Sequence, residues 1–117
     1  MYGEGRNFVR TILRLAQERK ELTVVNDQIG TPTYTANLVQ GIMSIIETDE
    51  FGTYHMSNSG YCTWYDFAKE FLRLAGLSTG VKPITTSEFA AAALRPRYSV
   101  LRNYMLELSG GDYFRCW

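Results

Sequence analysis

The stretch LTVVNDQIGTPTYTANLVQGIMSIIE, residues 22–47, decides the fold class because it joins a strand pattern to a helix pattern through a loop. Residues 22–25 are mostly β-branched, which predicts a short strand. Residues 26–33 are dense in turn formers and predict a loop. Across residues 35–47 the aliphatic side chains recur at helical spacing, which predicts an amphipathic helix. Its apolar face consists of Leu38, Val39, Ile42, Ile45 and Ile46.

The same alternation of helix-like and strand-like segments continues on both sides and indicates α/β organisation. Further helices are expected at residues 7–19, 64–74, 87–93 and 103–108, and further strands at residues 53–57 and 81–85. Thr63 with Asp66 is the expected capping box of one helix, Gly76 its end, and Ser87 the expected cap of another. The helix after Thr63 is expected to direct four side chains inward: Trp64, Phe67, Phe71 and Leu74. A chain of 117 residues predicts one domain over residues 1–117.

The overall composition is that of an ordinary globular protein, with 45% hydrophobic and 21% charged residues. Twelve basic residues balance twelve acidic ones, so charge gives no reason to expect nucleic acid or an anionic membrane as a partner. No apolar run approaches the ~20 residues that span a bilayer. The two cysteines, Cys62 and Cys116, form no C-x-x-C pair, and a reducing, cytoplasmic location is therefore expected.

Two short motifs imitate a dehydrogenase. Gly3 and Gly5 form only G-x-G, and no strand precedes them, so no cofactor-binding residues are expected in this chain. Tyr65 and Lys69 match the Tyr-x-x-x-Lys pair of short-chain dehydrogenases, in which lysine lowers the tyrosine pKa. Any helix brings positions i and i+4 together, so the pair is interpreted as structural and no catalytic residue is assigned.

The remaining charged and histidine side chains leave alternatives open. Arg6, Arg10 and Arg14 share one helical face, which is either solvated or places Arg6 near a diphosphate at the helix N-terminus. His55 is the only histidine and has no cysteine at ligand spacing, so no metal site is expected and His55 is interpreted as structural.

The loop of residues 27–33 is the most informative segment for ligand binding. Gly30 and Pro32 restrict its backbone, while Gln28, Thr31 and Thr33 offer hydrogen-bonding groups that suit a hydroxyl-rich ligand such as a sugar. The alternative is a turn that packs on itself.

Several motifs, in one order along residues 2–106, resemble those of the dTDP-4-dehydrorhamnose reductases, a family of extended short-chain dehydrogenases. They are Asn7-Phe8, Leu13-Arg14-Leu15, Asp27-Gln28-x-Gly30-x-Pro32-Thr33, Tyr54-His55 through Gly60, Thr63-Trp64-Tyr65-Asp66-Phe67-Ala68, Pro83-x-Thr85-Thr86 and Arg95-Pro96-x-x-Ser99-x-Leu101. The resemblance implies an α/β fold that is the C-terminal substrate-binding part of this enzyme, with the N-terminal Rossmann half missing. That half carries the NADP(H) or NAD(H) site and the true Tyr-x-x-x-Lys.

The resemblance also implies a function. The family reduces the C4 ketone of dTDP-4-dehydrorhamnose to dTDP-rhamnose, a step of nucleotide-sugar and polysaccharide biosynthesis. This chain is expected to supply the side that binds the dTDP-sugar, to be inactive alone as a fragment, and to need the missing Rossmann half or to self-associate. The alternative is a non-catalytic binding or regulatory module. The candidate substrate-binding residues are Asn7, Gln28, Thr31, Thr33 and Arg95.

Overall fold

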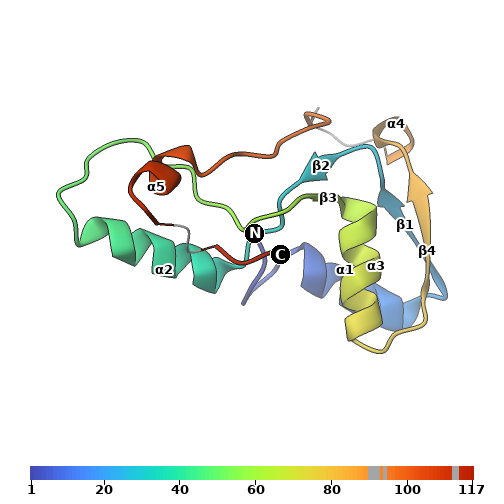
Figure 1. Ribbon diagram of the computed structural model, residues 1–117. Coiled ribbons are helices and arrows are strands. Elements are labelled where there is room, and N and C mark those ends of the chain that lie inside the picture. The colour runs from blue at the N-terminus through green and yellow to red at the C-terminus, as the bar shows by residue number, and fades with distance from the viewer. Residues whose placement is uncertain (90–92, 94, 112–113) are drawn as a thin grey trace.

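The computed structural model describes residues 1–89, 93, 95–111 and 114–117, and shows a mixed α/β chain (Figure 1). Its elements, in order, are α1 (Phe8–Glu18), β1 (Glu21–Val25), β2 (Ile29–Gly30), α2 (Thr35–Ile46), β3 (Cys62–Thr63), α3 (Trp64–Leu74), β4 (Gly80–Ile84), α4 (Thr86–Phe89) and α5 (Tyr104–Leu108). The predicted helix over residues 87–93 corresponds in part to α4, and its residues 90–92 lie outside the described residues.

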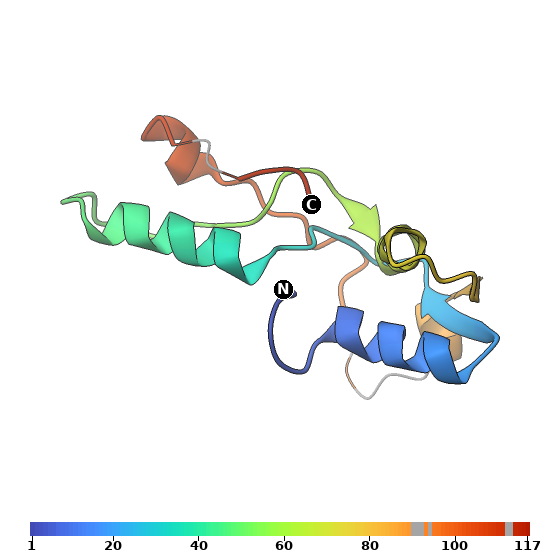
Figure 2. The same ribbon diagram turned by 90° about the horizontal axis from the view of Figure 1, so that it is seen from below.

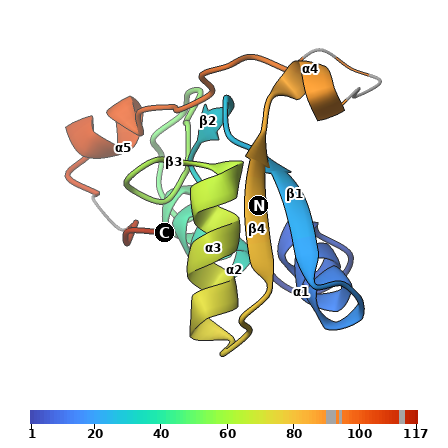
Figure 3. The same ribbon diagram turned by 90° about the vertical axis from the view of Figure 1, so that its right-hand side faces the viewer.

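The hydrophobic core lies between two helices and a two-stranded parallel sheet. β1 pairs with β4 in a register that runs from Glu21 opposite Gly80 to Val25 opposite Ile84. Along β1, buried residues alternate with exposed ones, so one face of the sheet is covered by α1 and α3 (Figure 3). The core cluster consists of Ile12, Ala16, Leu22, Val24, Ala68 and Leu72. We call α1, β1, α3 and β4 the body.

Local signals set the ends of the body helices. The Asn7 side chain accepts a hydrogen bond from the backbone N–H of Arg10 at 3.1 Å and so caps α1. Thr63 and Asp66 form the predicted capping box of α3. Gly76 follows α3 with φ of 69°, a conformation that favours glycine, which confirms the predicted end.

One inward position of α3 was predicted wrongly. Leu74 is 70% exposed, whereas Leu72 is 2% exposed and Ala68 is fully buried. α1 and β1 both pack against α3. The side of α3 that they cover carries residues 68 and 72, and Leu74 points away from it.

A second part of the chain projects away from the body. It comprises residues 35–58, which include α2, and residues 103–108, which include α5; we call it the arm (Figures 1 and 2). The antiparallel pair of β2 with β3 and the bridge of Tyr2 to Tyr34 lie where the arm meets the body. The molecule is consequently elongated, with extents of 51 × 29 × 21 Å.

The predicted strand at residues 53–57 is wrong. The segment has no strand pairing with any described residue. It is held instead by Asn103, which accepts a hydrogen bond from the Ser57 N–H at 3.0 Å and donates one to the Ser57 carbonyl at 2.7 Å. A β-prone sequence becomes a strand only where another strand lies beside it.

Two other local predictions also need correction. The loop of residues 26–33 contains the short strand β2. The cap of α4 is Thr85 rather than Ser87, because Thr85 and Glu88 exchange hydrogen bonds at 2.7 and 3.4 Å in a capping arrangement. Within the described part of the chain, none of the helices has the length and apolar character needed to cross a membrane.

Candidate functional site

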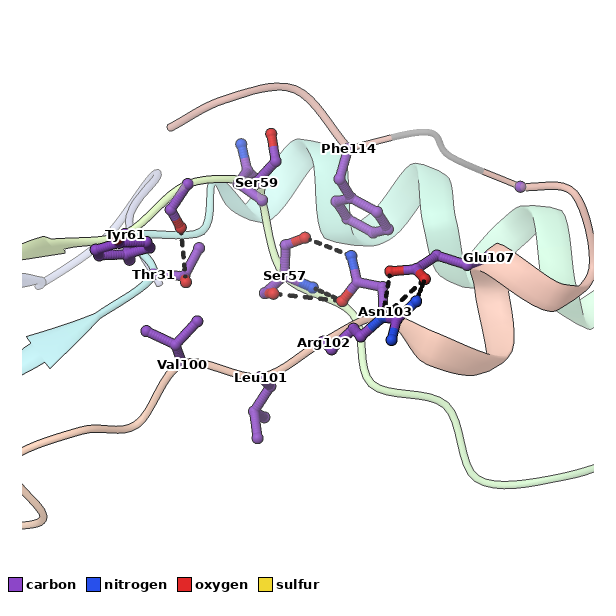
Figure 4. Close-up of a pocket in the computed structure, with 13 residues that line it drawn as sticks. Thr31, Ser57, Ser59, Tyr61, Val100, Leu101, Arg102, Asn103, Glu107 and Phe114 are labelled. Atoms are coloured by element: carbon purple, nitrogen blue, oxygen red, sulfur yellow. Dashed lines mark hydrogen bonds and ion pairs between the residues drawn. The ribbon is translucent and has the colours of Figure 1, made fainter.

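The larger of two neighbouring pockets has a volume of about 350 Å³ and lies where the loops that join body and arm meet (Figure 4). Thr31 comes from the loop after β2, residues 57–61 from the loop before β3, and residues 100–103 from the segment before α5. Figure 4 shows the Ser57–Asn103 hydrogen bonds and the Arg102–Glu107 ion pair at its wall. The lining is therefore rich in hydroxyl and amide groups.

The second pocket, of about 260 Å³, adjoins the first and shares Thr31, Ser57 and Leu101 with it. Its other walls are more apolar and include Pro32, Thr33, Met56, Cys62, Thr63, Trp64 and Ser99. An aromatic ring beside hydroxyl groups suits the mixed apolar and polar surface of a sugar. Thr31 stands between the two pockets.

Hydrogen bonds hold the loop that carries Thr31 in one conformation. The Thr31 hydroxyl donates to the Gly60 carbonyl at 3.0 Å. Thr33 is 5% exposed; its hydroxyl donates to the Thr31 carbonyl at 3.3 Å and accepts from the Asn58 N–H at 3.3 Å. The structure thus brings Thr31 and Thr33 together at the second pocket.

Gln28 and Asp27 hold the same loop from the other side. Gln28 is 7% exposed, and its amide donates to the Thr86 hydroxyl at 3.0 Å. Asp27 accepts the Thr86 N–H at 2.9 Å and the Thr86 hydroxyl at 2.6 Å, and these bonds lower the pKa of Asp27. Gln28 lines neither pocket, and its side chain packs against the first residue of α4 instead.

The other two predicted substrate-binding residues lie apart from both pockets. Asn7 caps α1 and donates to the Gly3 and Gly5 carbonyls at 2.8 and 3.1 Å. Arg95 is exposed and lines neither pocket. Arg6 precedes the cap of α1 and is exposed, while Arg14 pairs with Glu18 at 2.9 Å on a solvated face.

Among the described residues that line the larger pocket, the charges of Arg102 and Glu107 cancel. The Arg102 guanidinium contacts the Glu107 carboxylate at 2.6 to 3.2 Å, and this hydrogen bonding lowers the pKa of Glu107. Arg102 also lies over the Tyr104 ring, 5.1 Å from its centroid. Because the cation in the described part of this lining is already paired, the pocket suits the uncharged part of a ligand better than a phosphate.

Asn58 is a site residue that the sequence did not single out. It is 4% exposed and lines the larger pocket, and its Oδ1 accepts no hydrogen bond from the described residues. Such a buried, unsatisfied acceptor costs about 1–3 kcal/mol. The sequence predicts a turn at Asn58-Ser59-Gly60 and the start of a helix at Asn103. It assigns no site role to Asn58, Asn103 or Phe114, because their contacts join segments far apart in the chain.

Of the side chains that could imitate catalytic groups, Tyr65, Lys69 and His55 lie outside both pockets, whereas Cys62 lines the second. The Lys69 ammonium lies over the Tyr65 ring, 5.2 Å from its centroid, which is a cation–π contact. His55 is exposed, and its interpretation as a structural histidine stays a prediction. Burial raises the pKa of Cys62 to about 12, assisted by Asp66 and Cys116, so its thiol stays protonated. Among the described residues, no three histidine, cysteine or acidic side chains are grouped to hold a metal ion.

The described residues do not fit a dinucleotide site. A pyrophosphate needs a strand, a glycine-rich turn and a helix N-terminus in direct succession. β4 runs into α4 through Thr85, β3 runs directly into α3, and Gly5 has a positive φ but follows an isolated bridge rather than a strand. No step of a reaction is therefore assigned to a cofactor bound by this chain.

The family model for the RmlD substrate binding domain matches residues 1–117. The Bacillus subtilis spore coat polysaccharide biosynthesis protein SpsK is 44% identical over 111 residues, which cover 94% of this chain and 39% of that protein.

Two solved structures are similar over nearly the whole chain. A dTDP-4-dehydrorhamnose reductase of Clostridium acetobutylicum matches with a TM-score of 0.96 and 51% identity, covering 99% of this chain and 41% of that one. The dTDP-4-dehydrorhamnose reductase of Bacillus anthracis, in complex with NADP, matches with a TM-score of 0.95 and 47% identity. The match covers 98% of this chain and 41% of that one. The chain thus spans about two fifths of the length of these relatives.

Proposed function

This chain belongs to the RmlD substrate binding domain family, and on that premise we propose that it binds a dTDP-sugar. It supplies the sugar-nucleotide side of a dTDP-4-dehydrorhamnose reductase, which reduces a C4 ketone to form dTDP-rhamnose. NADPH, when bound, supplies the hydride for that reduction. The observation that carries the proposal is the family match over residues 1–117, together with the paired pockets on either side of Thr31.

The pocket chemistry assigns different tasks to the candidate residues. Thr31 and Thr33 line the pockets and are proposed to face the ligand. Gln28 is proposed to fix the loop beneath them through Thr86, and Asn7 to fix the entrance of α1. Arg95, which is exposed, is proposed to meet the diphosphate, because the Arg102 guanidinium in the larger pocket is already paired with Glu107.

The proposed partners follow from the surfaces. α2 leaves Val39, Ile42, Met43 and Ile46 between 45% and 70% exposed, which suits an apolar neighbour: a cofactor-binding Rossmann half or another copy of the chain. Cys62 and Cys116 are both free, which suits the reducing cytoplasm. A non-catalytic binding or regulatory module is the second candidate function, supported by pockets that are lined without any Tyr-x-x-x-Lys pair.

Calorimetry on the 117-residue chain tests the proposal. We expect dTDP-rhamnose and dTDP to bind, with heat lost in Thr31→Val, and NADPH to give no heat. The matched control is Thr23→Val, because Thr23 is exposed on the far face of β1. Absence of dTDP-sugar binding would contradict the proposal. A micromolar NADPH dissociation constant would contradict the view that this chain binds the sugar nucleotide and another part of the enzyme binds the cofactor. Addition of a cofactor-binding half distinguishes the two candidate functions. Reductase activity in the mixture would support a part of the enzyme, and its absence would favour the regulatory module.

A further inference from the structure

Gly41, in the middle of α2, marks a close contact. Glycine is unfavourable in the interior of a helix, so its presence there calls for a packing reason. Gly41 is the buried residue of α2. A Cβ atom at this position would lie 2.6 Å from Cζ of Phe114 and 3.4 Å from Sδ of Met56. The missing side chain thus leaves a hollow that the Phe114 ring fills.

The Phe114 ring is held on this hollow by the residues that follow it. The Ser59 N–H donates to the Arg115 carbonyl at 2.9 Å, and the Trp117 N–H donates to the Ser59 carbonyl at 3.2 Å. The Trp117 ring lies edge-on to the Phe67 ring of α3, with centroids 5.7 Å apart. Residues 114–117 therefore tie α2, the pocket loop and the body together.

The same ring is a wall of the larger pocket. Phe114 is 6% exposed and lines this pocket, and Figure 4 shows its ring beside α2, directed toward Ser57 and Asn103. Met56, the other neighbour of Gly41, lines the second pocket. The surface of α2 at Gly41 therefore supports one wall of each pocket.

We propose that Phe114 is a positioning residue for the nucleotide-sugar: seated on Gly41, its ring fixes the distance between α2 and the pocket loop, and so the width of the larger pocket. The inference rests on the proposed function. Phe114 acts through the shape of the cavity, because a pocket that is already formed binds without the cost of reorganisation. Widening or displacing this wall weakens binding even when every polar group of the pocket is intact.

Four variants and the wild-type chain test the proposal by calorimetry with dTDP. Gly41→Ala forces the ring outward, and we expect the dissociation constant to rise about tenfold, as for an overpacked site. Phe114→Leu removes the ζ carbon and is expected to weaken binding less. The double variant, Gly41→Ala with Phe114→Leu, is expected to bind better than Gly41→Ala alone, because the clash is gone. Gly80→Ala is the matched control. A Cβ atom at Gly80 would lie 3.6 Å from its nearest neighbour, the Lys20 carbonyl oxygen, and Gly80 does not line the pocket.

The possible outcomes separate this inference from the function on which it rests. If the wild-type chain does not bind dTDP, the proposed function fails and the inference falls with it. If the wild-type chain binds and Gly41→Ala binds equally well, or the double variant gives no rescue, only the role of Phe114 is wrong. Should Gly41→Ala unfold by circular dichroism, Phe114→Ala decides. A folded Phe114→Ala chain with about tenfold weaker binding supports the role, and one with unchanged binding overturns it.

Discussion

The body and the arm hold their shape by different means. In the body, six residues from α1, β1 and α3 form one buried cluster. In the arm, α2 buries only Gly41, and its aliphatic face remains exposed. Leu106 of α5 in the arm and Phe114, which packs on α2, are buried but lie outside the body's cluster. The difference teaches that one continuous apolar cluster holds the body together, whereas the arm is held by a few contacts with distant segments, such as Phe114 on Gly41 and Asn103 on Ser57.

The largest expected effect is the loss of a body core side chain. Leu72 is 2% exposed, and Leu72→Ala is expected to lower the free energy of unfolding by about 2–5 kcal/mol. Ile46 in the arm is 70% exposed, and Ile46→Ala is expected to change it by less than about 0.5 kcal/mol. Urea unfolding followed by circular dichroism measures both. Similar losses for the two variants would erase the distinction between body and arm.

The second effect concerns assembly. We expect the wild-type chain to self-associate through the exposed face of α2, because an apolar patch of this kind is unusual on a monomer. Ile42→Glu is expected to reduce the mass measured by light scattering. Leu74→Glu is the control, at a site of the body that is 70% exposed against 45% for Ile42, and is expected to leave the mass unchanged. A sharp, dispersed NMR spectrum at monomer mass for the wild type would show that the arm needs no cover.

The third effect is smaller and confined to the arm. Asn103 holds Ser57 through bonds of 2.7, 3.0 and 3.3 Å, and Asn103→Ala is expected to cost about 1–3 kcal/mol of local stability. Hydrogen exchange at the Ser57 amide measures this loss, while amides of β1 stay protected. Leu108→Ala on the same helix is the control, because Leu108 is 64% exposed. Unchanged protection at Ser57 would show that the tether does not hold the segment.

The sequence predicts the body better than the arm, because the arm is held by contacts between distant segments. The capping box of Thr63 and the end at Gly76 were predicted because their signals lie within a few residues. The strand at residues 53–57 was wrong because strand propensity does not say whether a neighbouring strand exists. Thr31 and Thr33 stood out on a loop restricted by Gly30 and Pro32; both line the second pocket, and their contact with a substrate stays a prediction. Asn58, Asn103 and Phe114 could not be predicted, because each acts through a contact with a distant segment.

The fourth effect depends on pH and lies on the body side of the junction. The hydrogen bonds from Thr86 lower the pKa of Asp27 below its ordinary value of 3.8. The bonds to the ionised carboxylate therefore stabilise the folded state fully when the pH is above 3.8. This contribution is lost as the pH falls through the lowered pKa. We expect the stability difference between the wild type and Asp27→Asn to shrink from pH 7 to pH 3 in thermal unfolding. Asp49→Asn in the exposed part of the arm is the control, and a constant difference for Asp27→Asn would refute the linkage.

The smallest expected effect is that of Tyr65→Phe. Tyr65 packs beside the body core, and Lys69 lies over the face of its ring rather than at its hydroxyl group. Phenylalanine keeps the ring, so we expect the free energy of unfolding and the dTDP affinity to remain unchanged within error. No NADPH-dependent reduction of the 4-keto sugar is expected from either the wild-type chain or the variant, because the pair lines neither pocket and the described residues offer no pyrophosphate turn. Turnover by the wild type that Tyr65→Phe abolishes would show that the pair is catalytic, and the body would then carry chemistry as well as structure.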